Sequence, residues 1–192
     1  MAQGRDTVTL YTAQSDAVID AVHGGVAFSR EEYVSRKYGE SAPIFLTAYR
    51  WFAAEAQKLV PRPEGAGLPY WVFGSVQSVD RSGGGRLLTL EVPRDQAVFF
   101  DMYDWNRVLQ LKYMGASEKQ ERAFCEELAR RGLRESDVVL SQFYPDLRQQ
   151  IIQSWDRLFC HHESIRSGDL TGVGAVQAAL WCIRREWVVS WG

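Results

Sequence analysis

The tetrapeptide Cys160-His161-His162-Glu163 brings together side chains that can ligate a metal or act in nucleophilic catalysis. Adjacent histidines point in different directions in most backbone conformations, so both rarely reach one ion. Zinc sites favour spacings such as C-x2-C or H-x3-H, which this segment lacks. A Cys–His nucleophile pair also needs its two side chains to meet in space. We therefore predict no metal site here, and we expect a polar loop from Cys160 to Gly174.

Glu91 is the strand carboxylate that could perform acid–base chemistry, because it lies between Leu90 and Val92. An inward carboxylate would need a partner or would have a raised pKa. An outward one would only be solvated, which is the commoner case for glutamate. Asp101 and Asp104 are expected to cap a helix rather than to act as catalytic acids.

Aromatic side chains could provide a stacking surface for a base or a nicotinamide ring, since the chain has seven tryptophans. Most of them fall on apolar faces and are expected in the core. Tyr70 and Trp71 are the exception, because neighbours on a strand face opposite sides and one of the two can line a cleft. Ser82-Gly83-Gly84-Gly85 is not a phosphate-binding loop, because no Gly-Lys-Ser/Thr follows it and a strand comes next.

The elements that must position these residues follow from the apolar pattern. Residues 7–11 alternate as a strand, and Ser15 can cap a helix that ends at Gly24-Gly25. Residues 41–59 predict a helix that buries three side chains, which are Phe45, Phe52 and Leu59. Residues 69–92 predict a β-hairpin that turns at Ser82–Gly85, with its first strand continuing through residues 75–77 beyond a bulge at Gly74.

The second half of the chain begins with a short apolar strand at residues 97–100. A charged helix with a thin apolar stripe at Phe124 and Leu128 follows over residues 117–131, and a helix begins at Tyr144-Pro145. Two closing strands are expected at residues 176–183 and 187–191. Strands at both ends with helices between them predict one α+β domain over residues 1–192, with a mixed or antiparallel sheet and a helical block at 117–160.

Composition excludes several classes of protein. Of 192 residues, 46% are hydrophobic, and 22 Lys and Arg oppose 24 Asp and Glu for a net charge of -2. This balance argues against nucleic-acid binding through bulk charge. No apolar run approaches the roughly 18 residues of a membrane span. Without a secretory signal at the start, three scattered cysteines are expected to be reduced thiols in the cytoplasm.

Six sequence blocks resemble a bacterial family, the domain of unknown function 3841. They occur in this order along nearly the whole chain: LYTAQ, PYWVF, LLTLEVP, DMYDW, SWDRLF and VQAALWCIRREWVV. Their order and spacing make this resemblance specific. The family implies no established activity.

The chain also resembles proteins of the ADP-ribosyltransferase-like fold. The similar features are Leu10-Tyr11-Thr12, the helix from Ser15, the Gly25-Val26 step, and LLTLEVP followed by DMYDW. Thr12 stands where that fold has a basic residue, and Gln177 stands where it has the catalytic glutamate. The resemblance implies a nucleotide cleft in which Gln177 lies beside Thr12.

This resemblance predicts binding of NAD or a related nucleotide. Thr12 and Gln14 would hydrogen-bond the ribose or amide, Tyr70 or Trp71 would stack, and Gln177 would hold the ribose hydroxyls. Glutamine lacks the charge that offsets a ribosyl cation, so altered or absent transfer chemistry is expected. If the cleft is live, the activity would be ADP-ribosyl transfer or N-glycoside hydrolysis.

Two alternatives remain open. The chain could be a non-catalytic interaction or regulatory module, for example in phage conflict, that binds a protein partner through the charged helix at 117–131. It could also be a small biosynthetic enzyme that uses Glu91 as acid or base. In both cases Gln177 could be an ordinary strand residue far from any pocket.

Overall fold

The computed structural model describes residues 6–192, which form eight helices and eight strands together with short 3-10 turns. The strands are β1 (Thr7–Gln14), β2 (Val26–Phe28), β3 (Tyr70–Phe73), β4 (Arg86–Pro93), β5 (Ala97–Asp101), β6 (Val176–Leu180), β7 (Cys182–Arg184) and β8 (Val188–Trp191). The helices are α1 (Asp16–His23), α2 (Glu31–Tyr38), α3 (Ala42–Leu59), α4 (Met102–Leu109), α5 (Glu118–Arg130), α6 (Glu135–Leu140), α7 (Pro145–Ser154) and α8 (His162–Ser167).

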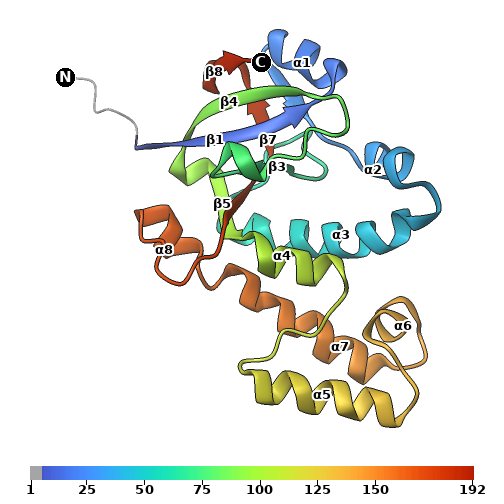
Figure 1. Ribbon diagram of the computed structural model, residues 1–192. Coiled ribbons are helices and arrows are strands. Elements are labelled where there is room, and N and C mark those ends of the chain that lie inside the picture. Colours follow the sequence, from blue (N-terminus) through green and yellow to red (C-terminus); the bar gives the residue numbers. More distant parts are fainter. Residues whose placement is uncertain (1–5) are drawn as a thin grey trace.

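Six strands form one antiparallel sheet in the order β5-β6-β3-β1-β4-β8. The strands β2 and β7 form a separate two-stranded sheet. Figure 1 shows this sheet region above α3 and α4, with the first strand of the chain in its middle. The predicted α+β class with an antiparallel sheet is confirmed.

The predicted hairpin over residues 69–92 is wrong in its pairing. Both segments are strands, but β3 and β4 are not paired, because β1 lies between them and pairs with both. The continuation through residues 75–77 is also wrong, since β3 ends at Phe73 and a 3-10 turn covers Val76–Ser78. Residue alternation identifies strands, but it does not identify the neighbour that a strand chooses.

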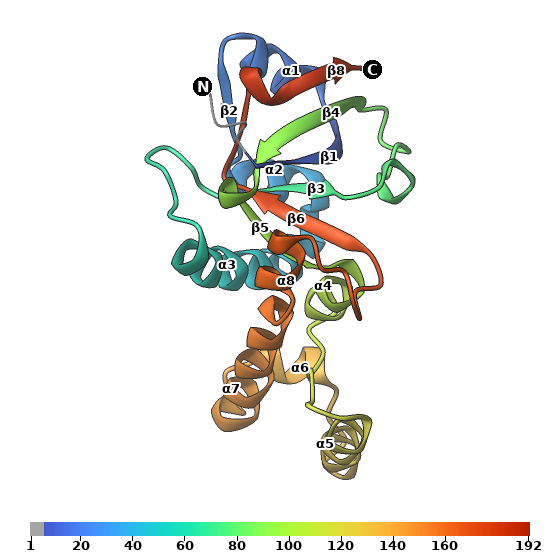
Figure 2. The same cartoon turned by 90° about the vertical axis from the view of Figure 1, so that its left-hand side faces the viewer.

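The sheet has two different faces, since side chains alternate along each strand. On one, which we call the α3 face, Val98, Phe100 and Ala179 pack with α3 and α4. On the other, the α1 face, Leu10, Val72, Leu90 and Phe99 pack with α1, α8 and the β2–β7 pair. Figure 2 shows α3 and α4 below the sheet and α1 above it.

Helix α3 supplies the centre of the core, as its amphipathic pattern predicts. Phe52 is completely buried, in contact with aromatic rings from both the sheet and the helices. Phe45 is only half-buried. The predicted burial of Leu59 is wrong, because it lies in the last turn and is 39% exposed.

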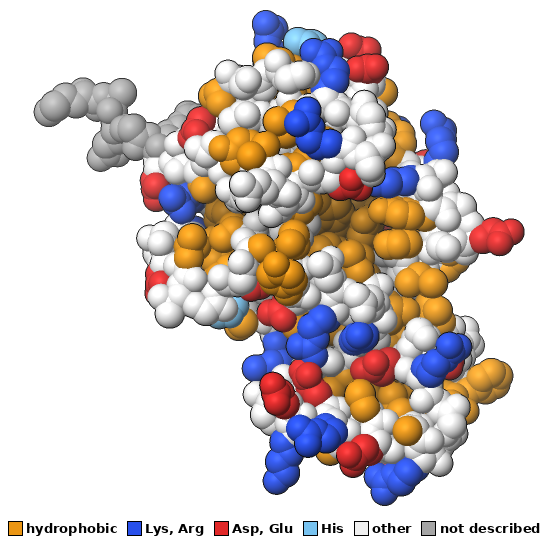
Figure 3. Space-filling view, in the orientation of Figure 1, with side chains coloured by type: hydrophobic (Ala, Val, Ile, Leu, Met, Phe, Trp, Pro, Cys, Tyr) orange, Lys and Arg blue, Asp and Glu red, His pale blue; other side chains and the backbone are white. Residues whose placement is uncertain are grey.

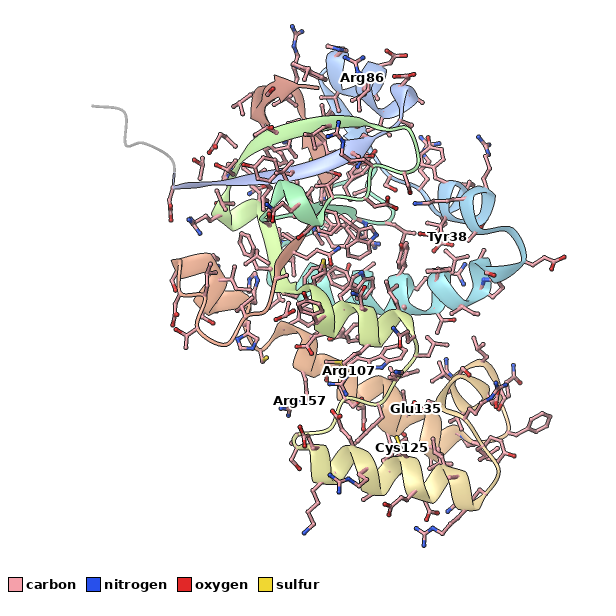
Figure 4. The ribbon with its side chains drawn as sticks, in the orientation of Figure 1. Tyr38, Arg86, Arg107, Cys125, Glu135 and Arg157 are labelled. Carbon is pink, nitrogen blue, oxygen red and sulfur yellow. The ribbon has the colours of Figure 1, made fainter. Side chains whose placement is uncertain are left out.

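The predicted helical block is confirmed as α5, α6 and α7, which lie beyond α3 and α4 from the sheet (Figure 1). Phe124 and Leu128 form its buried stripe on α5, as expected. Figure 4 shows Arg107 on the side of α4 that faces the block, with Glu135 of α6 and Cys125 of α5 beneath it. There Arg107 pairs with Glu121 of α5, which ties the block to α4.

Two further expectations need correction. The segment 160–174 is not a continuous loop, because it contains α8. The expected strand 176–183 is divided, since β6 belongs to the large sheet and β7 pairs with β2. No helix within residues 6–192 is both long enough and apolar enough to cross a bilayer.

Candidate functional site

Gln177 is the second residue of β6, and its position in the sheet is unusual for an amide. It pairs with Phe73 of β3 on one side and with Phe100 of β5 on the other. Phe73 pairs in turn with Tyr11 of β1. Cross-strand partners share a face, so the four side chains form one row on the α3 face. We call this the Gln177 row.

The Gln177 side chain is buried, with 4% exposed, and its Oε1 has no hydrogen-bond partner among the residues described. It is the one buried side-chain oxygen or nitrogen in residues 6–192 that is left without a partner. A buried polar atom in this state costs free energy, and nearly all such atoms in proteins are paired. The position therefore has a feature that folding alone does not explain.

Aromatic side chains surround this amide on the α3 face. Trp71 lies two residues before Phe73, so it has the same orientation, and its ring is 6.2 Å from that of Phe100. Both Trp71 and Phe73 are only half-buried. Figure 3 shows apolar side chains gathered in a hollow between strands β1 and β3 and helices α3 and α4.

Two tyrosines extend the aromatic surface toward α2. Tyr38 reaches from the end of α2 toward α3 (Figure 4), where it stacks on Phe45 with ring centroids 3.8 Å apart. Tyr49 of α3 lies 5.1 Å from Trp71, ring to ring. Burial and the neighbouring Tyr38 phenol raise the pKa of Tyr49, so it stays protonated and can donate a hydrogen bond.

A cavity of about 590 Å³ adjoins the Gln177 row. Its lining residues are Val8, Thr9, Gly74, Ser75, Ser78, Arg94, Tyr103, Ile165, Gly168, Leu170, Val173, Gly174, Ala175 and Val176. They come from β1 and β6, from the segment that follows β3, from the 3-10 turn after β4, from α4, and from α8 with the segment between α8 and β6. The volume lies in the usual range for small-molecule sites.

No residue of the row lines the cavity, but the row is next to the cavity wall along three strands. Thr9 precedes Tyr11 by two residues, Gly74 follows Phe73, and Val176 precedes Gln177. Each of the three central strands therefore passes directly from the row into the cavity wall. We refer to the cavity together with the row as the candidate site.

One wall of the cavity is built around Asp101, which is buried at the end of β5. Its carboxylate accepts hydrogen bonds from the backbone N–H groups of Tyr103 and Gly174, so it caps α4 as expected and holds the segment before β6. A Cβ atom at Gly174 would lie 2.7 Å from the Tyr103 ring. Burial raises the pKa of Asp104, and the charge of Asp101 adds to this.

The predicted proximity of Thr12 and Gln177 is wrong. The two strands are separated by β3, and Thr12 pairs with Leu88 on the α1 face, opposite to Gln177. The Thr12 hydroxyl is buried, donates to the Trp71 carbonyl at 3.0 Å and accepts from the Gln14 amide at 2.8 Å. Both predicted polar contacts of β1 are therefore engaged within the sheet.

Tyr70 and Trp71 face opposite sides, as predicted. Tyr70 is 7% exposed on the α1 face, where burial raises its pKa. Trp71 alone lies on the α3 face with Gln177. A ligand on the α3 face would not reach the side chains of Tyr70, Thr12 and Gln14, for which cofactor contacts are predicted.

Glu91 also lies on the α3 face, half-buried in β4. Its carboxylate accepts hydrogen bonds from the hydroxyls of Thr7 at 3.0 Å and Thr9 at 2.5 Å. β1 and β3 lie between β4 and β6, so Glu91 is not next to Gln177. It borders the candidate site through Thr9, which lines the cavity.

The side chains of the segment from Cys160 to Glu163 contact the rest of the fold. His162 is buried, and its Nδ1 accepts a hydrogen bond from the backbone N–H of Phe99 at 3.0 Å. Burial and the Asp104 carboxylate raise the pKa of Cys160, which disfavours the thiolate. Within residues 6–192 no group of three or more His, Cys, Asp or Glu side chains is arranged to hold a metal. The three cysteines are unpaired.

Several residues of the candidate site were not singled out by sequence reasoning, and four of them bear on the argument. Tyr11 and Phe73 belong to the row, and Arg94 and Tyr103 line the cavity. Tyr11 had a signal, because alternation places it opposite to Leu10, which is fully buried. Arg94 and Tyr103 had none, since their place depends on how α8 and α4 pack on the sheet.

The sequence matches the family described as Domain of unknown function (DUF3841) over residues 9–189. The chain belongs to this family. The match begins within β1 and ends within β8, so it covers Gln177 and the rest of the Gln177 row. No curated protein and no solved structure matches the chain.

Proposed function

We propose that this protein binds NAD or a related nucleotide in the candidate site. The observation that carries the proposal is the buried, unpartnered Oε1 of Gln177, in a strand whose preceding residue, Val176, lines a cavity of about 590 Å³. A ligand hydroxyl or amide would supply the missing donor. A buried acceptor without a donor is expected where a bound ligand supplies the donor.

The aromatic residues fit the flat rings of a nucleotide. Tyr11, Trp71 and Phe73 offer partly exposed rings on the same face as Gln177. A base or nicotinamide ring stacks favourably on such side chains, with up to about 1–3 kcal/mol per base. Stacking provides affinity, and the hydrogen bond to the Gln177 amide orients the ligand.

In this proposal Gln177 holds a ribose hydroxyl as an acceptor, and Trp71 stacks. The resemblance to the ADP-ribosyltransferase-like fold implies NAD as the nucleotide, while its implied contact between Thr12 and Gln177 is absent. Glutamine cannot offset a developing ribosyl cation as a carboxylate does, so we propose binding with weak or absent transfer. Glu91 is held by two threonine hydroxyls and would act on a ligand only through the cavity wall.

The proposal is tested by thermal unfolding with NAD, ADP-ribose, ATP and nucleosides. A ligand that binds only the folded state raises the midpoint by mass action, by about 2.7 kcal/mol of stability at 100 times Kd. We expect NAD and ADP-ribose to raise the midpoint. No shift with any nucleotide at millimolar concentration would refute the proposal. We propose that the protein acts in the bacterial cytoplasm, where cysteines are kept reduced and NAD is present.

A second candidate function is protein binding by the helical block. Phe143, between α6 and α7, is 85% exposed, and Leu140 nearby is 47% exposed. Such exposure of large apolar side chains is unusual unless they contact a partner. Cross-linking in a cell extract tests this role, with Phe143→Ser as the control. The substitution should reduce cross-linking to a partner and leave nucleotide binding unchanged.

A further inference from the structure

Arg94 has a special position in the cavity that adjoins the Gln177 row. Its side chain lines the cavity and is 25% exposed. It is the only charged residue in the lining, since the others are apolar, glycine or hydroxyl-bearing. No residue in the lining itself carries a carboxylate, and the Asp101 carboxylate behind the wall is engaged by backbone N–H groups, so the lone cation in the lining favours an anionic ligand group.

The contacts of Arg94 fix its guanidinium while leaving donors available. Nη1 donates to the backbone carbonyls of Ile165 and Arg166, at 3.4 and 3.2 Å, at the end of α8. Nε donates to Asp6 at 3.0 Å, and the Asp6 side chain is 84% exposed. Nη2 donates to no residue in the part of the chain that the structure describes. The guanidinium is thus oriented before any ligand arrives, which lowers the entropic cost of binding.

The neighbours of Arg94 in the lining suit phosphate oxygens. Ser75, Ser78, Thr9 and Tyr103 place hydroxyl groups around the same cavity. Hydroxyls donate to phosphate oxygens, and arginine binds them with charge-assisted hydrogen bonds. The exposed ion pair with Asp6 competes little, because pairs of this kind contribute at most about 1 kcal/mol.

We propose that Arg94 binds a phosphate group of the ligand, so that the cavity accepts phosphorylated nucleotides and discriminates against nucleosides. This inference rests on the proposed function for the identity of the ligand, and it extends it by assigning the phosphate end. The phosphate lies in the cavity, and the base lies along the Gln177 row. Arg94 is then a specificity-determining residue for phosphorylated ligands.

A purely structural role for Arg94 makes a different prediction. Arg94 caps the end of α8, so its removal lowers stability whether or not it meets a ligand. Loss of stability alone would weaken all ligands equally. Only contact with the phosphate weakens the phosphorylated ligand and leaves the unphosphorylated one unaffected.

The experiment compares nicotinamide mononucleotide with nicotinamide riboside, which differ by one phosphate, by calorimetric titration. The proteins are wild type, Arg94→Gln, and Arg122→Gln on the exposed side of α5 as the control. Inorganic pyrophosphate is titrated as a probe without a base. We expect wild type to bind the mononucleotide about 10- to 100-fold more tightly than the riboside, as charged hydrogen bonds allow. In Arg94→Gln this ratio should approach one, with riboside affinity and the control unchanged.

The outcomes separate this inference from the proposed function. Pyrophosphate binding that depends on Arg94, without binding of either nucleotide form, supports the phosphate site and refutes the nucleotide proposal. Equal wild-type affinity for the two forms refutes the role of Arg94 and leaves nucleotide binding standing. An equal loss of affinity for the mononucleotide and the riboside in Arg94→Gln also overturns the inference. Binding of none of the three probes by wild type overturns both proposals.

Discussion

His162 of α8 accepts a hydrogen bond at Nδ1 from the backbone N–H of Phe99 in β5, at 3.0 Å. β5 is an edge strand of the large sheet, so this bond pairs a donor that no further strand would satisfy. The imidazole is 3% exposed. Because Nδ1 is an acceptor, the ring is neutral when this hydrogen bond between α8 and the sheet is made.

Acid should therefore destabilise the protein through His162. Burial lowers its pKa, and this exceeds the opposing effect of Glu163, whose carboxylate lies 3.7 Å from Nε2. Below the unfolded pKa of about 6.5 the unfolded chain binds a proton that the folded chain does not. Stability should fall by up to about 1.4 kcal/mol per pH unit from pH 6.5 downward, until the folded pKa is reached. Above pH 6.5 this contribution is constant.

Urea unfolding between pH 5 and 8 measures this effect. In His162→Gln the slope below pH 6.5 should be reduced relative to wild type, while His161→Gln, at the half-buried neighbouring position, should keep it. An identical slope in wild type and His162→Gln would contradict the assignment. Comparison with wild type is needed because surface carboxylates also contribute at low pH.

Phe52→Ala should destabilise the protein by about 3–5 kcal/mol, the range for a buried phenylalanine. Phe52 is fully buried, with ring centroids 5.0 Å from Trp71 and 5.2 Å from Phe100 and Trp105. Leu59→Ala, in the same helix but 39% exposed, should cost much less. Denaturant unfolding of both variants checks this, and equal losses would show that the α3 register is wrong.

Gly174→Ala should impair the candidate site more than the fold. A Cβ there would lie 2.7 Å from the Tyr103 ring, which is 60% exposed and can swing away at low cost. We expect a stability loss of under about 1 kcal/mol, below the usual range for overpacking in a core. Nucleotide affinity should fall because the cavity wall moves. Gly83→Ala is the control, since nothing lies within 4 Å of its Cβ. Unchanged nucleotide affinity in Gly174→Ala would mean that this part of the cavity wall does not contribute to binding.

Gln177→Met should stabilise the protein without ligand. Methionine has nearly the shape of glutamine and carries no amide that needs partners, so the unmet Oε1 disappears. Relief of a buried unsatisfied group is worth about 1–3 kcal/mol. Thermal unfolding measures the change. A loss of stability would mean that the amide is satisfied in the folded protein, which would remove the physical basis of the proposed site.

Much of the fold follows from the sequence, because local alternation and helix periodicity identify most elements. The pairing does not follow, as β1 shows by lying between β3 and β4. The turn-forming segment Ser82–Gly85 favours a hairpin, but such a segment also connects two strands that flank a third. Similarly, α8 has only a weak apolar stripe, and its place is fixed by His162 and Ile165 against the sheet.

The site was predicted only in part, for a reason of geometry. The resemblance selected Gln177 and Trp71, which do lie on one face. It also selected Thr12, which lies on the other face, because a residue's face depends on the register between strands. A shift of one residue in the pairing moves every side chain of a strand to the other face. Neither composition nor spacing specifies the pairing across three strands.

Calorimetric titration of NAD into wild type, Gln177→Ala and Gln149→Ala tests the central claim most directly. Gln149 is exposed on α7 and serves as the matched control. Wild type and Gln149→Ala should bind NAD equally. Gln177→Ala should bind it about 2- to 10-fold more weakly, which corresponds to the loss of one neutral hydrogen bond of about 0.5–1.5 kcal/mol. No binding by wild type, or equal binding by all three proteins, would contradict the account.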